Sequence, residues 1–252
     1  MRPTPVQKSE AFTRIELCVV FVVGFVVLSS MFLQSHRVSN RSPRISCINN
    51  LKQIGTAYRI WSNDHGDRFP ASQSLTNGGW SELLQRANEG FMCWINYAIM
   101  SNELGQCSRP LVCPSDERKP ADAFSNFVSN IHLSYLVGVS ADDTYPQSLL
   151  AGDRNLGAGT EPDREYGFSP QSGEGNDVAI QTNSKAGPVC WSLKIHSQGT
   201  TNGAGNILLG DGSAQQVTSG SFRKIWQPNF NPTTNWPVGH VPPHPCIRVL
   251  FP

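Results

Sequence analysis

An uncharged, apolar run from Leu17 to Leu33 is the feature that most constrains what this chain can fold into. Seventeen helical residues cover about 25 Å, which is the short end of what crosses the hydrocarbon core of a membrane. The rest of the chain is polar enough to bring the mean hydropathy to −0.29. The run therefore predicts a transmembrane or assembly helix over residues 12–33, with Arg14 and Glu16 at its head.

Two common interpretations of this run, a signal peptide and a plain membrane anchor, give Glu16 no specific role. A signal peptide usually has an apolar part of about 7–15 residues followed by a small-residue cleavage site, and the sequence QSHRVSNRSPR that follows offers no clear site. In a plain membrane anchor, Glu16 is only a flanking charge. Basic residues stand on both sides of the run, so their balance does not decide its orientation: Arg2, Lys8, Arg14, Arg37, Arg41 and Arg44.

The stretch AFTRIEL (11–17) resembles the cleavage site of type IV pilin precursors and type II secretion pseudopilins. That site has a short basic leader, a small residue, Phe, and Glu as the fifth mature residue. The resemblance implies a leader of residues 1–11, cut by prepilin peptidase between Ala11 and Phe12, and methylation of the new Phe12 amine. It also implies that Glu16 pairs with the amine of a neighbouring subunit, because a carboxylate inside an apolar bundle needs an opposite charge. The family usually has Leu where Arg14 stands, and Arg14 offers Glu16 a second partner within its own helix.

Residues 34–63 are predicted to hold a linker and an amphipathic helix. Apolar residues recur at intervals of three and four, and the pattern ends near Asn63, where Asn-Asp-His-Gly and then Pro70 follow. Pro43 biases Ser42 away from helix, so either two helices or one helix broken near 38–43 is expected. The apolar positions are Ile45, Ile48, Leu51, Ile54, Tyr58 and Trp61.

Four blocks extend the resemblance to pseudopilin-like proteins abundant in planctomycete and verrucomicrobial bacteria. They are CINNLKQIGTAYRIWSNDHGDRFP (47–70), LVCPSDERKPA (111–121), LSYLVGVSADDTYPQSLLAGDRN (133–155) and GNILLGDGSAQQVT (205–218). Many members of this group carry a His nine residues before an Asp-Gly pair, whereas His196 precedes Asp211 by fifteen positions. The pilin resemblance implies that the second helix packs on a small antiparallel sheet.

The body, residues 64–252, is predicted to be an α+β globular domain. We expect it to be rich in loops because the chain contains 22 Gly and 18 Pro. Asp211-Gly212 predicts a tight hairpin turn between two short strands, with both residues at positive φ. Further strands are expected within 132–139, 148–153 and 188–195, a helical turn at 221–226, and an edge strand at IRVLF (247–251).

The seven cysteines allow several interpretations. Cys18 lies in the apolar run and is expected to be unpaired. The other six allow 15 pairings, of which Cys107 with Cys113 would close a small loop. Disulfides are favoured over buried thiols in the extracytoplasmic compartment that the leader implies. The six are Cys47, Cys93, Cys107, Cys113, Cys190 and Cys246.

Enzymatic motifs are missing from the sequence. It has no Gly-x-Ser-x-Gly elbow, Walker loop, His-Glu-x-x-His or dinucleotide fingerprint, so no catalytic residue, metal site or cofactor is predicted. Calcium near Asp142, Asp143 and Asp153 is possible, but turn and cap roles suit these residues better. The six tryptophans could bind sugars if exposed, although Trp is more often in a core. The net charge of +1, without a run of like charges, argues against a nucleic-acid partner.

These observations predict a pseudopilin-like structural subunit with a single-pass inner-membrane location and a periplasmic body. It would assemble with other pseudopilins or with itself through its N-terminal helix, in a type II secretion or type IV pilus-like system. The alternative is a membrane-tethered extracytoplasmic protein that binds a glycan or an export substrate and uses the pilin leader only as an anchor.

Overall fold

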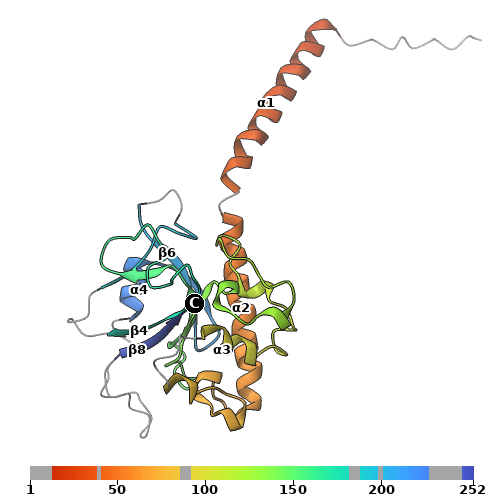
Figure 1. The fold of residues 1–252 in the computed structure, drawn as a ribbon. Helices are drawn as coiled ribbons and strands as arrows, with labels where there is room; N and C mark the ends of the chain where they lie inside the picture. The colour runs from red at the N-terminus through yellow and green to blue at the C-terminus, as the bar shows by residue number, and fades with distance from the viewer. Residues whose placement is uncertain (1–12, 39–40, 86–91, 182–187, 198–200, 227–245) are drawn as a thin grey trace, which may run out of the picture. The chain divides into compact units, whose positions relative to one another are not determined.

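The computed structural model describes residues 13–38, 41–85, 92–181, 188–197, 201–226 and 246–252 (Figure 1). The chain divides into two compact units, residues 1–42 and 43–252. The predicted processing site, Ala11 and Phe12, lies outside the described residues. Helix α1 (Arg14–Val38) belongs to the first unit, and helix α2 (Arg41–Asp64) extends into the second.

Helix α1 presents its apolar side chains to solvent. The large apolar residues from Ile15 to Leu28 are each between 51% and 77% exposed. Because apolar residues surround the helix on all sides, it has no polar face to turn outwards. No described residue of the first unit buries these side chains.

The prediction of a membrane-spanning segment is wrong. Among the described residues, no helix is long and apolar enough to cross a membrane. Physically, seventeen uncharged residues cover only about 25 Å, against a hydrocarbon core about 30 Å thick. The finding overturns the predicted single-pass inner-membrane location with a periplasmic body.

Helix α2 confirms the amphipathic helix predicted from the sequence. Its buried face is formed by Cys47, Leu51, Ile54, Tyr58 and Trp61, each at most 2% exposed. Helix α1 ends at Val38 and α2 begins at Arg41. The predicted break near 38–43 includes Ser39 and Asn40, which lie outside the described residues. Pro43 falls in the first turn of α2, where its missing N–H leaves no helical hydrogen bond unmade.

The second unit is built on a six-stranded antiparallel sheet with strand order β4-β8-β1-β2-β6-β7. A two-stranded antiparallel sheet pairs β3 with β5. The strands are β1 (Tyr135–Gly138), β2 (Leu149–Asp153), β3 (Leu156–Ala158), β4 (Asn176–Gln181), β5 (Val189–Trp191), β6 (Ala204–Leu209), β7 (Ala214–Thr218) and β8 (Cys246–Phe251).

Helices and short 3-10 turns complete the unit. Two further α-helices are α3 (Cys93–Ile99) and α4 (Ser219–Trp226), the latter over the predicted helical turn. The 3-10 helices are Pro70–Ser72, Leu75–Asn77, Leu83–Gln85, Arg109–Leu111, Phe124–Asn126 and Asn130–His132.

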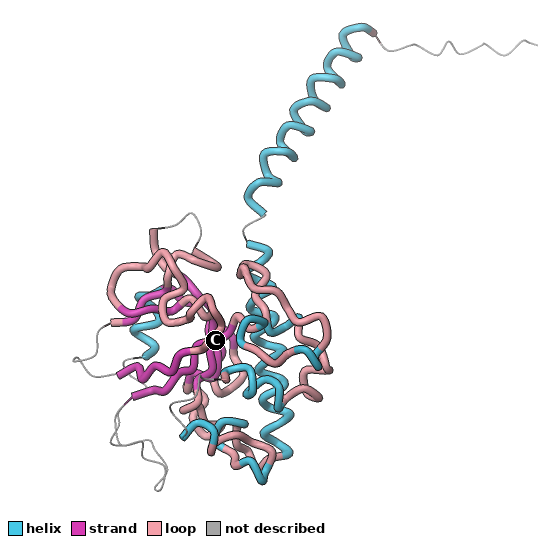
Figure 2. The backbone as a smooth tube through the Cα atoms, viewed as in Figure 1, coloured by secondary structure: helices cyan, strands magenta, loops and turns pink. Residues whose placement is uncertain are grey.

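The large sheet is covered on both faces (Figure 2). Alternate residues of a strand point to opposite faces, so Tyr135 and Val137 of β1 join the core beneath α2 and α3, while Leu136 joins the core beneath α4. Trp191 and Phe222 pack edge to face in this second core, with ring centroids 5.2 Å apart. The α+β class with a small antiparallel sheet is thus confirmed.

Three details differ from the sequence prediction. Strand β8 is interior, between β4 and β1, instead of being an edge strand, because no proline falls within Cys246–Phe251 and both sides of the strand are free to pair. Strands β3 and β4 and helix α3 were not predicted. In the β6–β7 hairpin only Gly212 has a positive φ, 81°. Its N–H donates to the carbonyl of Leu209, as in a turn followed by a glycine bulge.

Candidate functional site

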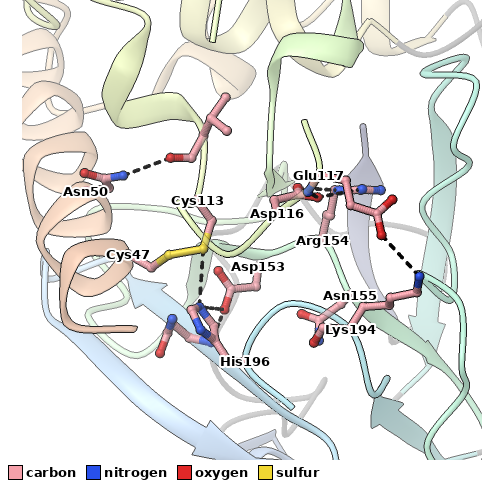
Figure 3. The surroundings of a disulfide bond; sticks show 12 residues. Cys47, Asn50, Cys113, Asp116, Glu117, Asp153, Arg154, Asn155, Lys194 and His196 are labelled. Atoms are coloured by element: carbon pink, nitrogen blue, oxygen red, sulfur yellow. Dashed lines mark hydrogen bonds and ion pairs between the residues drawn. A yellow bond between two sulfur atoms is a disulfide. The ribbon is translucent and has the colours of Figure 1, made fainter. Parts of the chain in front are cut away.

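A disulfide between Cys47 and Cys113 lies at the centre of the second unit (Figure 3). It joins the buried face of α2 to the loop that follows Arg109–Leu111, with a Cα–Cα distance of 5.2 Å. Both cysteines are fully buried. The suggested Cys107–Cys113 bridge is therefore wrong, and Cys107 is an exposed free thiol. Free thiols are also found at Cys18, which is exposed, and at Cys93 and Cys190, which are buried.

His196 directs one ring nitrogen at two groups. Its Nε2 lies 3.5 Å from the Sγ atom of Cys113 and 3.3 Å from the Oδ2 atom of Asp153. The side chains of His196 and Asp153 are 1% and 0% exposed. Figure 3 shows the imidazole and the carboxylate beside the disulfide. A sulfur, a nitrogen and an oxygen, each able to ligate a metal, therefore meet in a dry interior.

Asp153 is incompletely satisfied in this interior. Its Oδ2 accepts a 2.6 Å hydrogen bond from the backbone N–H of Asn206, but its Oδ1 is buried with no hydrogen-bond partner. The side-chain oxygen and nitrogen of Asn206 lack hydrogen-bond partners as well, as does the buried Nε of Arg44. Buried polar atoms in native proteins are nearly always paired, so this concentration of unpaired atoms around one carboxylate marks a special site.

Burial governs the protonation of the pair. It raises the pKa of Asp153 to about 8, against the opposing effects of the Asn206 N–H and the Arg44 charge. It lowers the pKa of His196 to about 4, and the positive charge of Arg44 acts in the same direction. Both shifts favour uncharged groups, as expected where water is excluded. The pair therefore holds one proton near neutral pH.

The arrangement differs from a Cys-His-Asp catalytic triad. In such a triad the acid binds one ring nitrogen and the nucleophile faces the other. Here Cys113 and Asp153 approach the same nitrogen of His196. The sulfur is also committed to a disulfide. The side chains of Cys113, His196 and Asp153 are therefore arranged like metal ligands around one point, and not like a chain of groups that passes a proton.

The backbone around His196 is held in a strained conformation. Ile195, the residue before it, has a φ of 58°, a conformation that β-branched residues rarely adopt and that costs on the order of 1–3 kcal/mol. The side-chain amide of Asn155 secures this segment by donating to the carbonyls of Ser192, Lys194 and Ala204. Strain of this kind persists only where surrounding contacts fix it, and it places the imidazole.

A buried ion pair between Asp116 and Arg154 supports the site. Asp116 follows Cys113 by three residues, and Arg154 directly follows Asp153. Arg154 donates to both carboxylate oxygens of Asp116 at 2.7 and 2.8 Å, and its guanidinium lies 3.5 Å from the ring centroid of Tyr166. Burial alone would raise the pKa of Asp116, but the hydrogen bonds and charge of Arg154 bring it below its usual value. The pair therefore stays charged and fixes the loop that carries Cys113.

Sequence reasoning did not find this site, although its parts lay in recognisable blocks. CINNLKQIG supplies Cys47, LVCPSDERKPA supplies Cys113 and Asp116, and LLAGDRN supplies Asp153. Each block sets polar or charged residues beside apolar ones, which is the signal that was available. His196 was noted only for its spacing from Asp211.

Glu16 has a local partner that the sequence analysis overlooked. Its Oε2 accepts hydrogen bonds from the backbone N–H and hydroxyl of Thr13, at 2.8 and 3.0 Å. This is a capping box, in which Thr13 and Glu16 close the first turn of α1. The hydrogen bonds from Thr13 hold the pKa of Glu16 below its usual value. Among the described residues, no ion pair joins Arg14 to Glu16, so Arg14 does not satisfy the carboxylate.

The residues weighed for calcium and sugar binding have other contacts. Asp142 accepts from the N–H and hydroxyl of Thr144, Asp143 pairs with Arg59, and Asp153 lies in the site above. In the part of the chain that the structure describes, the only His, Cys, Asp and Glu side chains grouped as three or more potential ligands are Cys47, Cys113 and His196. Trp61, Trp80 and Trp191 are at most 2% exposed, as expected of core residues.

Comparison with known proteins gave no match: no protein-family model, no curated protein and no solved structure is similar to this chain.

Proposed function

We propose that this protein is a pseudopilin-like structural subunit that assembles with copies of itself or related subunits through α1. The observation that supports this most is the exposure of α1, whose large apolar side chains from Ile15 to Leu28 are 51–77% exposed. Apolar patches of this size on soluble proteins mark interaction sites. A bundle of like helices would bury them in the way that coiled-coil cores do.

The head of the helix fits such an assembly. Glu16 is charged and fully exposed, and among the described residues only Thr13 forms hydrogen bonds with its carboxylate. In a bundle, a carboxylate at the helix start would meet the N-terminal amine of a neighbouring helix. The capping box and the pairing are compatible, since a carboxylate has about four lone-pair sites and two donors occupy only part of them.

Processing is the first test. On co-expression with a prepilin peptidase, the mature chain should begin at Phe12 and carry a methylated amine, which N-terminal sequencing and intact mass measure. Ala11→Leu should block the cut, because a large residue replaces the small one at the scissile bond. An unprocessed parent chain, or a cut at another bond, would contradict the proposal.

Assembly is the second test, and it separates the two roles of Glu16. Glu16→Gln keeps a side chain that can complete the capping box but removes the charge. Thr13→Ala removes the capping hydroxyl but keeps the charge. If subunit pairing uses the charge, only Glu16→Gln should abolish cross-linking between α1 helices, with Cys18 as the cross-linking site. Equal cross-linking in both variants would rule out the pairing role.

A further inference from the structure

We propose that Cys47, Cys113, His196 and Asp153 form a redox-gated metal site, which holds a disulfide when oxidised and a zinc-class divalent cation when reduced. The proposal is independent of subunit assembly. It starts from the ligand atoms of Cys47, Cys113 and His196, which all lie within 4.8 Å of one another. Asp153 contributes a fourth atom, 3.3 Å from Nε2 of His196.

The distances fit a tetrahedral ion. With metal–sulfur bonds of about 2.3 Å and metal–nitrogen or metal–oxygen bonds of about 2.0–2.1 Å, a tetrahedron places its sulfur and nitrogen roughly 3.6 Å apart and its nitrogen and oxygen roughly 3.4 Å apart. The corresponding distances are 3.5 Å from Cys113 Sγ to His196 Nε2 and 3.3 Å from that nitrogen to Asp153 Oδ2. Both separations measured from Nε2 of His196 therefore already match those of a tetrahedral ion. The two sulfur atoms must move apart once the S–S bond is broken.

The chemistry of the donors is that of a zinc site. Two thiolates, an imidazole and a carboxylate are the ligand types that zinc takes in proteins. The imidazole of His196 is buried, and its Nε2 lies near both the sulfur of Cys113 and the carboxylate of Asp153. Because Cys113 and Asp153 share one nitrogen of His196, an ion between them would contact all three.

The unpaired polar atoms and the local charges point to the same cation. Asp153 is fully buried with Oδ1 unpaired, and the guanidinium of Arg44 interacts electrostatically with it. A divalent ion with two thiolates and one carboxylate has a net charge of −1, which the single positive charge of Arg44 balances. The strained φ of Ile195, 58°, aims the imidazole at this point.

The exchange between the two states balances as follows. An external dithiol reduces the disulfide: it supplies two electrons and two protons, is itself oxidised to a disulfide, and leaves thiols at Cys47 and Cys113. The divalent cation then displaces one proton from each thiol, and one from Asp153 where it is protonated. Because all four side chains are buried, we expect the ion to enter while the chain folds.

The test uses the full chain, unfolded and refolded with Zn²⁺ or Co²⁺ under a phosphine reductant, and separately refolded under oxidising conditions. The reduced chain should retain one equivalent of metal after dialysis, and cobalt should show the visible bands of a tetrahedral site with a thiolate charge-transfer band. The oxidised chain should retain none at this site. Metal retention that is equal in both states, or absent from the reduced chain, would overturn the proposal.

Alkylation mapping locates the ion without relying on a variant. Zn²⁺ should protect Cys47 and Cys113 from alkylation in the reduced, refolded chain, while Cys107, which is exposed, stays reactive and serves as the internal control. His196→Gln should weaken metal affinity at least tenfold, since even residues that only orient a ligand cost 10–100-fold. Cys107→Ser should leave affinity unchanged. Protection of Cys107 in place of Cys47 and Cys113 would contradict the assignment.

Discussion

Helices α1 and α2 are nearly equal in length, 25 and 24 residues, and yet are built for opposite surroundings. The apolar side chains of α1 surround the helix and are exposed, with Leu17 at 53%. Those of α2 lie on one face and are buried, with Leu51 at 0%. Helix α1 begins with its own capping box at Thr13 and Glu16, whereas α2 has no acidic residue in its first turn.

The difference shows where each helix obtains its stability. Most helical stability in proteins comes from packing of an amphipathic face rather than from intrinsic propensity. Helix α2 has such a face and is also cross-linked to the body through Cys47. Helix α1 has only its local cap and its length, so further stabilisation must come from outside the described residues. Changes in α2 should therefore affect the folding of the second unit, and changes in α1 should not.

The largest expected effect comes from breaking the link between α2 and the body. The Cys47–Cys113 disulfide has a sequence separation of 66, and the chain-entropy model assigns a loop of that length about 4 kcal/mol. Reduction in the presence of a metal chelator should lower the free energy of unfolding by that amount. Urea unfolding followed by tryptophan fluorescence measures it, because Trp61 and Trp191 are buried in the second unit.

Two controls accompany this measurement. Cys107→Ser removes an exposed free thiol and should change stability by less than about 0.5 kcal/mol. Refolding the reduced chain with Zn²⁺ should recover part of the lost stability, because a ligand that binds only the folded state stabilises it. A reduced, metal-free chain as stable as the oxidised one would mean that the disulfide does not hold α2 in place.

The same contrast explains how much could be predicted from the sequence. The spacing of apolar residues predicted α2 because its packing uses one face of the helix, and Asp211-Gly212 predicted the β6–β7 hairpin because the turn needs a glycine at positive φ. Both are local patterns. The pairing of Glu16 with another subunit stays a prediction, and its Thr-x-x-Glu capping box with Thr13 was missed.

The candidate site could not be predicted in this way. Cys47, Cys113, Asp153 and His196 are far apart in the sequence and meet only because the sheet brings β2 beneath the disulfide. Fifteen cysteine pairings were open, and spacing favoured Cys107 for Cys113 because short loops are easy to close. Burial of Cys47 on α2 decided the pairing instead, and that depends on the tertiary fold.

A matched pair of leucines tests the contrast within the helices themselves. Leu51→Ala in α2 leaves a cavity in the core and should destabilise the second unit by about 2–5 kcal/mol, and we expect a value near 3. Leu17→Ala in α1 makes the same change at an exposed position and should shift the urea midpoint by an amount equivalent to less than about 0.5 kcal/mol. Equal effects would show that α1 is packed against the folded body.

The smallest expected effect concerns the pH dependence of the oxidised chain. Asp153 has a folded pKa of about 8 against an ordinary value of 3.8, and His196 has a folded pKa of about 4 against 6.5. Between pH 4 and 6.5 the folded pair holds one proton, on Asp153, and the unfolded pair also holds one, on the histidine. The two contributions cancel there, so this pair makes stability insensitive to pH.

Above pH 6.5 the unfolded histidine loses its proton while the folded Asp153 keeps its own until about pH 8. The folded state then binds more protons, so stability falls as pH rises, by about 2 kcal/mol at most over this window. Urea midpoints at pH 6.5 and 8 measure the fall. Asp153→Asn cannot take up the proton and should show no fall, whereas Asp143→Asn, at a partly exposed ion pair with Arg59, should keep it. A parent chain whose stability stays level or rises over this window would show that the folded pair holds no proton above pH 6.5, with Asp153 ionised and His196 neutral.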